Sequence, residues 1–338
     1  VDPRIELLSV IQWLSNYGKI FRILTPYDSQ YKSAMLAHFS SLKKHEAVLL
    51  LNEIISRPMS VDYPPFAFGA PIEVMLHLMP DFTLNPAIFS NAFLVKRAGG
   101  EKMLQRLKKS LRRFYQDSRF QAFFEECRPI YEQIVRNNVA AAGEKDYIGE
   151  LEAFYGMKQG SYTFILAPLY AGVGFGPNIT IDGVRHTYEI LGSSGVENGL
   201  PVFNHRFDYM QRHEFSHTFV NPLTEEFWPQ MRQHFADYAS TAEAQEIVNE
   251  STIRAITTWF AYLDSREAGD LALQQEIASG FPLVEPLLGK INDYAANRVS
   301  YPTFHSFYHN LAGIFEGHRK QEYDSLGKAI EQMRISNW

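Results

Sequence analysis

The chain has 338 residues, of which 46% are hydrophobic and 21% are charged, a globular composition that excludes a disordered chain. Its formal net charge of −6 excludes the strongly basic surface expected of a nucleic-acid-binding protein, so we expect no nucleic-acid partner. The single cysteine excludes an intrachain disulfide and a zinc finger built on cysteines. At roughly 100–200 residues per domain, the length fits two domains or one large one.

The first 158 residues show the apolar spacing that is typical of helices. Asp2-Pro3 precedes the first such pattern and is a helix start signal. Helical patterns cover residues 5–14, 47–55, 103–114 and 120–139, with proline-containing breaks at 57–58 and 63–65. We therefore assign residues 1–158 to a helical N-terminal region that serves as scaffold and as one wall of a substrate cleft.

The pattern changes to that of strands near Gly160. Residues 162–166 form a β-branched and aromatic run that predicts a strand. Residues 178–181 and 184–191 flank Asp182-Gly183, a pair favoured in two-residue hairpin turns because both positions need a positive φ. The 23 uncharged residues 159–181 are long enough for a membrane span, but their prolines and glycines predict strands and turns. We therefore expect no transmembrane segment.

Helical spacing returns after Gly199, with breaks expected at Asn221-Pro222, at residues 280–282 and at Tyr301-Pro302. The expected fold class is α+β and predominantly α. In this prediction, residues 159–338 hold a small mixed β-sheet and an active-site helix, and they pack on the helical N-terminal half. The chain starts at Val1 without an initiator Met, so we expect a processed product and leave its compartment open, export with a removed signal included.

His213-Glu214-Phe215-Ser216-His217 is the motif H-E-x-x-H. On a helix, residues four apart lie on one face, so the two imidazoles can converge on a single metal ion. Glu214 lies at the flank of that face, where its carboxylate can reach a metal-bound water without ligating the metal. Phe215 points the other way and can anchor the helix in the core.

A catalytic zinc site needs a third protein ligand beside the two histidines. Glu250 follows His217 by 33 residues in a helix with apolar periodicity, and we favour it as that ligand. Asp237 and His234 stay open as alternative ligands. Glu250 could instead form an exposed i,i+4 ion pair with Arg254, which is the commoner meaning of that spacing.

H-E-x-x-H followed by Asn249-Glu250 on a later helix resembles the gluzincin branch of the zincin metallopeptidases, over roughly residues 160–265. The resemblance implies a zincin-like catalytic half. It also implies that His213, His217 and Glu250 bind Zn²⁺ and that Glu214 is the general base. Thermolysin-like gluzincins have an Asp four residues after the ligand Glu. Arg254 stands at that position here, so the residues that support the ligands must differ.

A second resemblance rests on two separate segments of the sequence. V-D-P-R-x-E-L-L at residues 1–8, together with H-E-F-S-H-T-F-V-N-P at residues 213–222, is similar to an uncharacterised bacterial family of zinc proteases. That family is described as a domain of unknown function, so the resemblance implies no particular substrate.

Together, these patterns predict a zinc-dependent metallopeptidase acting on peptide or protein substrates, in which zinc activates a water and Glu214 takes its proton. The gluzincin pattern places a Tyr or His beyond the Glu helix to stabilise the oxyanion. The candidates for that role are Tyr262, Tyr301, His305 and His309. Two other functions stay open: a non-enzymatic helical binding module with a structural or vestigial metal, and a zinc amidohydrolase that acts on a non-peptide amide.

Overall fold

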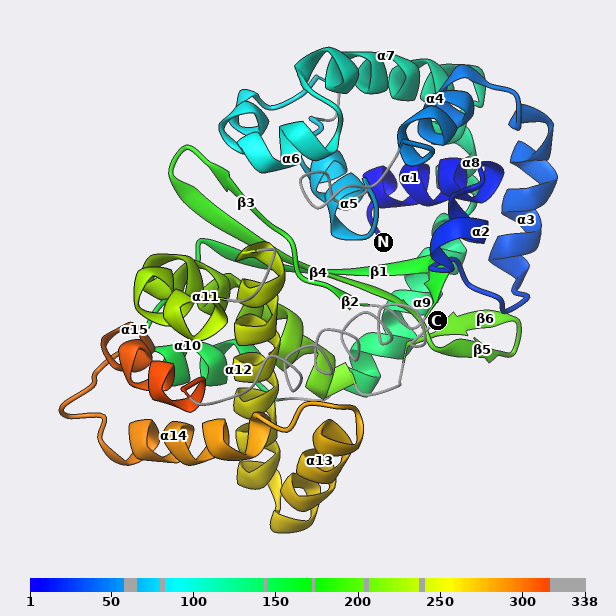
Figure 1. Cartoon of the computed structure of the whole chain (residues 1–338). Coiled ribbons are helices and arrows are strands. Elements are labelled where there is room, and N and C mark those ends of the chain that lie inside the picture. The colour runs from blue at the N-terminus through cyan, green and yellow to red at the C-terminus, as the bar shows by residue number, and fades with distance from the viewer. Residues whose placement is uncertain are drawn as a thin grey trace. The chain divides into compact units, whose positions relative to one another are not determined.

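The structure is a computed structural model that describes residues 1–57, 66–79, 83–142, 145–171, 174–203, 207–236 and 241–316. The chain is α+β and predominantly helical, as the sequence predicts (Figure 1). It divides into two compact units: unit 1 comprises residues 1–144 and 160–207, and unit 2 comprises residues 145–159 and 208–337. This division differs from the boundary expected between residues 158 and 159, because the strands group with the N-terminal helices.

Unit 1 combines a small mixed sheet with most of the helices predicted before residue 158. Its helices are α1 (Pro3–Leu14), α2 (Tyr17–Phe21), α3 (Gln30–Phe39), η1 (Ser40–Leu42), α4 (Glu46–Ile55), α5 (Gly69–Leu76), η2 (Pro86–Ser90), α6 (Ala92–Arg97), α7 (Glu101–Asp117), α8 (Phe120–Glu126) and α9 (Arg128–Ala142). Its strands are β1 (Ser161–Ala171), β2 (Gly174–Phe175), β3 (Asn178–Ile181), β4 (Val184–Ser193), β5 (Gly195–Glu197) and β6 (Leu200–Val202). The helices predicted at 5–14, 47–55 and 103–114 are thus confirmed as α1, α4 and α7.

The single helix predicted over residues 120–139 is wrong, because the chain forms α8 and α9 with a break at Cys127. Pro129 has no backbone N–H, and in a continuous helix its ring would clash with the carbonyl of Glu125. Proline is tolerated in the first turn of a new helix, and Pro129 lies in the first turn of α9. The breaks expected around Pro58 and at 63–65 lie outside the described residues.

β4 is the central strand of the sheet, with β1 parallel to it on one side and β2 and β3 antiparallel to it on the other. The predicted hairpin between β3 and β4 is confirmed. Asp182 and Gly183 at its turn have φ values of 51° and 78°, the left-handed backbone that this turn requires. A second hairpin, β5–β6, turns at Asn198-Gly199 in the same way and was not predicted.

Helix α1 fastens the strands to the N-terminal helices. Asp2 caps its start by accepting a hydrogen bond from the backbone N–H of Arg4 at 2.8 Å. Along β1, the Tyr170 hydroxyl donates to Gln12 Oε1 at 2.8 Å, and the Trp13 indole donates to the carbonyl of Leu169 at 3.4 Å. These contacts between α1 and β1 explain why the sheet belongs to unit 1.

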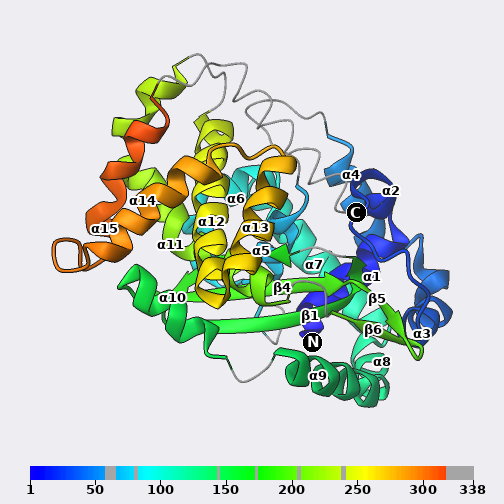
Figure 2. The same cartoon turned by 90° about the horizontal axis from the view of Figure 1, so that it is seen from below.

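Unit 2 is helical in the part of the chain that the structure describes. Its elements are α10 (Tyr147–Tyr155), α11 (Phe207–Met231), η3 (Arg232–Phe235), α12 (Thr241–Asp264), α13 (Arg266–Ala278), α14 (Val284–Ala296), α15 (Phe304–Phe307) and η4 (Tyr308–Ile314). Helix α12 packs on both α13 and α14 (Figure 2). The breaks expected at residues 280–282 and at Tyr301-Pro302 are confirmed, since they separate α13 from α14 and α14 from α15.

The break expected at Asn221-Pro222 is wrong, because α11 continues through Pro222 and also through Pro229. A proline inside a helix costs about 3 kcal/mol, since it removes one backbone hydrogen bond and crowds the preceding turn. Phe219, Val220 and Leu223 around it are all buried. Burial of these side chains stabilises the helical conformation more than the proline destabilises it.

Aromatic side chains form the centre of unit 2. Besides the ring of its neighbour Tyr155, the Phe154 ring of α10 has four rings from other helices within 5.5 Å of its centroid, those of Trp259, Phe260, Tyr294 and Phe304. These four rings come from α12, α14 and α15, so Phe154 links α10 to three other helices. Within the described residues, no helix is both long and apolar enough to cross a bilayer.

Candidate metal centre

Helix α11 carries the H-E-x-x-H motif and is held in the core by the residues around it. Phe215, inside the motif, is 2% exposed, as expected for the side that faces away from the histidines. One turn further on, the Phe219 ring stacks on Tyr155 of α10 with 4.2 Å between centroids. These buried rings fix the rotation of α11, and therefore the direction in which His213 and His217 point.

The residue directly before the motif is a buried arginine. Arg212 Nη1 donates to Asp264 Oδ2 at 2.8 Å, and Nη2 donates to Glu150 Oε2 at 2.8 Å. Lys145 lies in the same cluster and pairs with both of these carboxylates. The cluster ties α11 to α10 and to the C-terminal end of α12. It therefore fixes the position of α11 at the start of the motif.

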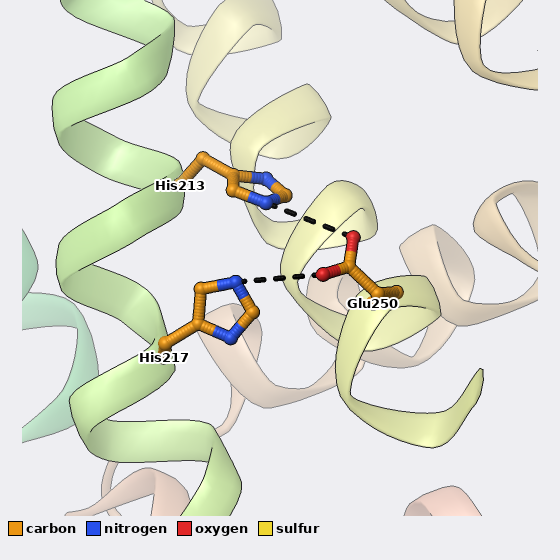
Figure 3. Close-up of side chains that lie close together, drawn as sticks. All are labelled: His213, His217 and Glu250. Atoms are coloured by element: carbon orange, nitrogen blue, oxygen red, sulfur yellow. Dashed lines mark ion pairs between the residues drawn. The ribbon is translucent and has the colours of Figure 1, made fainter. Parts of the chain in front are cut away.

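Three predicted metal ligands converge in unit 2 (Figure 3). Glu250 Oε2 lies 3.7 Å from His213 Nε2, and Glu250 Oε1 lies 3.5 Å from His217 Nε2. Ligand atoms of all three residues lie within 4.8 Å of one another. Donors that each bind a tetrahedral zinc at about 2.0–2.1 Å stand roughly 3.3 Å apart. The observed separations are close to that spacing.

The chemistry of this donor set also fits zinc. Two imidazole nitrogens and one carboxylate are a ligand set of catalytic zinc sites, which keep a further position for water or substrate. His213, His217 and Glu250 form the candidate metal group found in the described part of the chain. All three side chains are at least 86% buried, so the donors are shielded from bulk water.

The far side of the His217 ring is oriented by Asn221, one turn further along α11. His217 Nδ1 lies 3.2 Å from Asn221 Oδ1, an oxygen that can only accept. Nδ1 therefore carries the proton, and the lone pair of Nε2 points toward Glu250. Burial lowers the pKa of His217, but the Glu250 and Glu214 carboxylates outweigh it and hold the pKa above its ordinary value.

Glu214 is buried, with 7% of its surface exposed. Burial raises its pKa to about 7; the charges of His217 and Arg254 act in the opposite direction, and that of Glu250 adds to the rise. Glu214 is therefore a carboxyl group close to the histidines that can take up and release a proton near neutral pH.

Glu250 contacts both the two histidines and Arg254, the partners considered for it in the sequence. It lies against the two histidines, and it also accepts a hydrogen bond from Arg254 Nε at 3.2 Å. The Glu250–Arg254 pair is not the exposed ion pair considered above, because both side chains are more than 85% buried. Burial lowers the pKa of Arg254, but Tyr209, Glu250 and Glu276 outweigh it and raise the pKa above its ordinary value.

His234, one of the two alternative third ligands, does not join this group. His234 lies in η3, where its Nε2 is 3.4 Å from the side-chain nitrogen of Gln233. Asp237 lies outside the described residues. Among the carboxylates and imidazoles that the structure describes, Glu250 is thus the third member of the group.

The structure does not bring the expected oxyanion-stabilising residues to the histidines. Tyr262 follows Glu250 by 12 residues on α12, which is about 18 Å along a helix axis, and its hydroxyl donates to Asp270. His305 pairs at 3.0 Å with Glu226, which is nine residues past His217 on α11. In the structure, each of these two side chains thus pairs with a surface carboxylate on a distant turn.

The two remaining candidates lie together elsewhere in unit 2. The Tyr301 ring packs on Phe307 at 5.0 Å between centroids and lies 6.5 Å from the exposed His309 ring. Both contacts belong to the segment that joins α14 to η4. His309 is not a member of the group that His213, His217 and Glu250 form.

Two residues that contact the group were missed in the sequence, although a signal for them exists. Tyr209 stands four residues before His213, and Asn221 stands four residues after His217. The four side chains therefore follow one face of α11 at helical spacing. Tyr209 stacks its ring on His213 at 5.6 Å, and Asn221 bonds His217. Glu276, which binds Tyr209, lies on α13 and has no such signal.

Comparison with known proteins finds no matching curated protein and no matching solved structure. A family model described as "Domain of unknown function (DUF4932)" matches residues 1–314. The match covers the sheet of unit 1 as well as the three converging residues of unit 2. The protein therefore belongs to the DUF4932 family.

Proposed function

We propose that this protein is a zinc-dependent metallopeptidase whose ligands are His213, His217 and Glu250. The observation that supports this proposal is the convergence of two imidazoles and one carboxylate within 4.8 Å, with a buried Glu214 beside them. A structural zinc site is closed by four protein ligands, whereas three ligands leave a position for substrate. Among the residues that the structure describes, the group has three members, which favours a catalytic site over a structural one.

When bound, zinc supplies Lewis acidity, which lowers the pKa of a water molecule and polarises a carbonyl group. Glu214 takes the proton of the attacking water and later delivers it to the leaving amine. A carboxyl pKa near 7 suits both transfers at neutral pH. Asn221 keeps the Nδ1 proton of His217 in place, so that Nε2 stays available as a donor.

The test compares wild type with Glu214→Gln and Glu250→Ala, measuring zinc per chain and hydrolysis of casein and of quenched peptides. Glu214→Gln should keep one zinc and lose about 10²–10⁴-fold or more in kcat/KM, the usual contribution of a general base. Glu250→Ala should weaken zinc binding by more than about 100-fold, beyond the effect of losing a supporting contact. Glu225→Gln, an exposed glutamate on the same helix, is the control and should change neither quantity.

Three results would overturn the assignment in different ways. Loss of zinc in Glu214→Gln would make Glu214 a ligand rather than the base. Zinc binding without any hydrolysis in wild type would support a structural or vestigial metal. Hydrolysis confined to non-peptide amides would make the protein an amidohydrolase.

A further inference from the structure

A buried polar network starts at Glu250 and extends from α12 to α13. Arg254 Nε donates to Glu250 Oε2 at 3.2 Å, and Arg254 Nη1 donates to Glu276 Oε2 at 2.8 Å. The guanidinium lies over the Phe281 ring at 4.0 Å from its centroid. Arg254 therefore bridges a carboxylate of α12 and a carboxylate of α13 in one fixed plane.

Tyr209 connects this network to the other side of the site. Its hydroxyl donates to Glu276 Oε1 at 2.6 Å and lies 3.4 Å from Arg254 Nη1. Its ring stacks on His213 with an interplanar angle of 19°. A single chain of contacts thus runs from Glu250 through Arg254, Glu276 and Tyr209 to His213.

The charges of Arg254 and Glu276 neutralise each other in a buried region that is largely shielded from water. The Glu276 side chain is 2% exposed and that of Arg254 is 14% exposed. A buried guanidinium beside a ligand carboxylate would by itself oppose a metal cation at that carboxylate. Glu276 neutralises the guanidinium, so Arg254 can fix one oxygen of Glu250 without adding a net positive charge to the site.

We propose that Arg254, Glu276 and Tyr209 are positioning residues of the metal centre. Arg254 holds Glu250 Oε2 so that Oε1 is presented as a single ligand oxygen. Glu276 cancels the charge of Arg254, and Tyr209 fixes the plane of the His213 ring. The inference rests on the proposed function, and it assigns to a cationic residue the place where thermolysin-like gluzincins have an aspartate.

The network could instead be a bridge that only stabilises the packing of α11, α12 and α13. The two roles differ in what a conservative variant changes. Arg254→Lys keeps the charge but cannot bond both carboxylates in one plane. Tyr209→Phe keeps the ring on His213 and removes only the hydroxyl contacts with Glu276 and Arg254. A structural bridge would lose stability in these variants without any change at the metal.

The experiment uses the full-length protein with Arg254→Lys, Glu276→Gln and Tyr209→Phe. Zinc affinity is measured by competition with a chromophoric chelator, the visible spectrum is recorded with Co²⁺ in place of zinc, and thermal unfolding is measured without metal. Glu276→Gln and Arg254→Lys should each weaken zinc binding about 10–100-fold and shift the cobalt spectrum. Tyr209→Phe should fold like wild type and weaken zinc binding several-fold.

Arg298→Lys is the matched control, because Arg298 is a structural arginine of the same unit that bonds backbone carbonyls of α10. It should alter neither zinc affinity nor the cobalt spectrum. Wild-type affinity and spectrum in all three network variants, with only lower melting temperatures, would overturn the positioning role alone. Failure of the wild-type protein to bind zinc or cobalt would overturn the proposed metal centre and this inference with it.

Discussion

Replacing Glu6 by Gln should remove a pH-dependent loss of stability from unit 1. Glu6 lies on α1 and is completely buried. The Tyr31 hydroxyl donates to Glu6 Oε2 at 2.5 Å, and the Tyr131 hydroxyl donates to that of Tyr31 at 2.9 Å. Burial raises the pKa of Glu6 from 4.5 to about 7, although the hydrogen bond from Tyr31 acts in the opposite direction.

The sign of the effect follows from proton binding. Between pH 4.5 and about 7 the folded chain keeps the Glu6 proton and the unfolded chain has released it. The free energy of unfolding therefore falls as the pH rises through this window. At about 1.4 kcal/mol per pH unit, the contribution present below pH 4.5 is about 3 kcal/mol, and it is lost once the pH has passed 7.

The assay is urea unfolding of wild type and Glu6→Gln at pH 5 and pH 8, with amide hydrogen exchange of residues 3–14 to assign the transition to unit 1. Gln mimics the protonated carboxyl, so the wild type should lose about 2–3 kcal/mol relative to the variant between the two pH values. Glu126→Gln, an exposed carboxyl of the same unit, is the control and should show no comparable change. A difference between wild type and Glu6→Gln that is the same at both pH values would refute this reasoning.

Two further predictions concern the framework of unit 2. Arg212→Met should destabilise the protein by about 1–3 kcal/mol, less than the loss of a fully buried partner, because Glu150 and Asp264 are 31% and 34% exposed and stay partly hydrated. A loss below about 0.5 kcal/mol in urea unfolding would contradict the anchoring role of Arg212. Phe154→Ala should cost about 3–5 kcal/mol, since it leaves a cavity among four rings, and Phe154→Leu should cost clearly less. Equal costs for both variants would contradict this packing.

Much of the local structure could be predicted from the sequence, because it depends on residues that are neighbours in the chain. The Asp182-Gly183 turn forms because both positions adopt a positive φ, which the residue types themselves favour. The start of α1 follows from the Asp2 side chain, whose acceptor lies within reach of the Arg4 N–H. His213 and His217 share a face for an equally local reason, the four-residue helical spacing. Tyr209 and Asn221 follow the same spacing, although they were not predicted.

Tertiary structure decided the features that depend on packing between distant segments. The proline signal at Asn221-Pro222 predicted the end of a helix, but burial of Phe219 and Leu223 holds α11 together across it. The strands group with the N-terminal helices because β1 bonds α1 across more than 150 residues of chain. Neither feature could be predicted from a short stretch of sequence. The first depends on apolar surface that remote residues remove from water, and the second depends on hydrogen bonds between residues far apart in the chain.

In the candidate site too, some features follow from the local sequence and others from the packing of distant segments. The sequence predicts His213, His217 and Glu250 as metal ligands. It also allows a second role for Glu250, as the ion-pair partner of Arg254. The structure places both contacts on one carboxylate, because Arg254 is itself turned toward Glu276 of α13. Glu276 lies 22 residues beyond Arg254 on another helix, and only the packing of α13 on α12 brings the two charges together. Local helical spacing places the two histidines on one face, whereas the approach of Glu250 and of the side chains that contact it depends on how the helices pack.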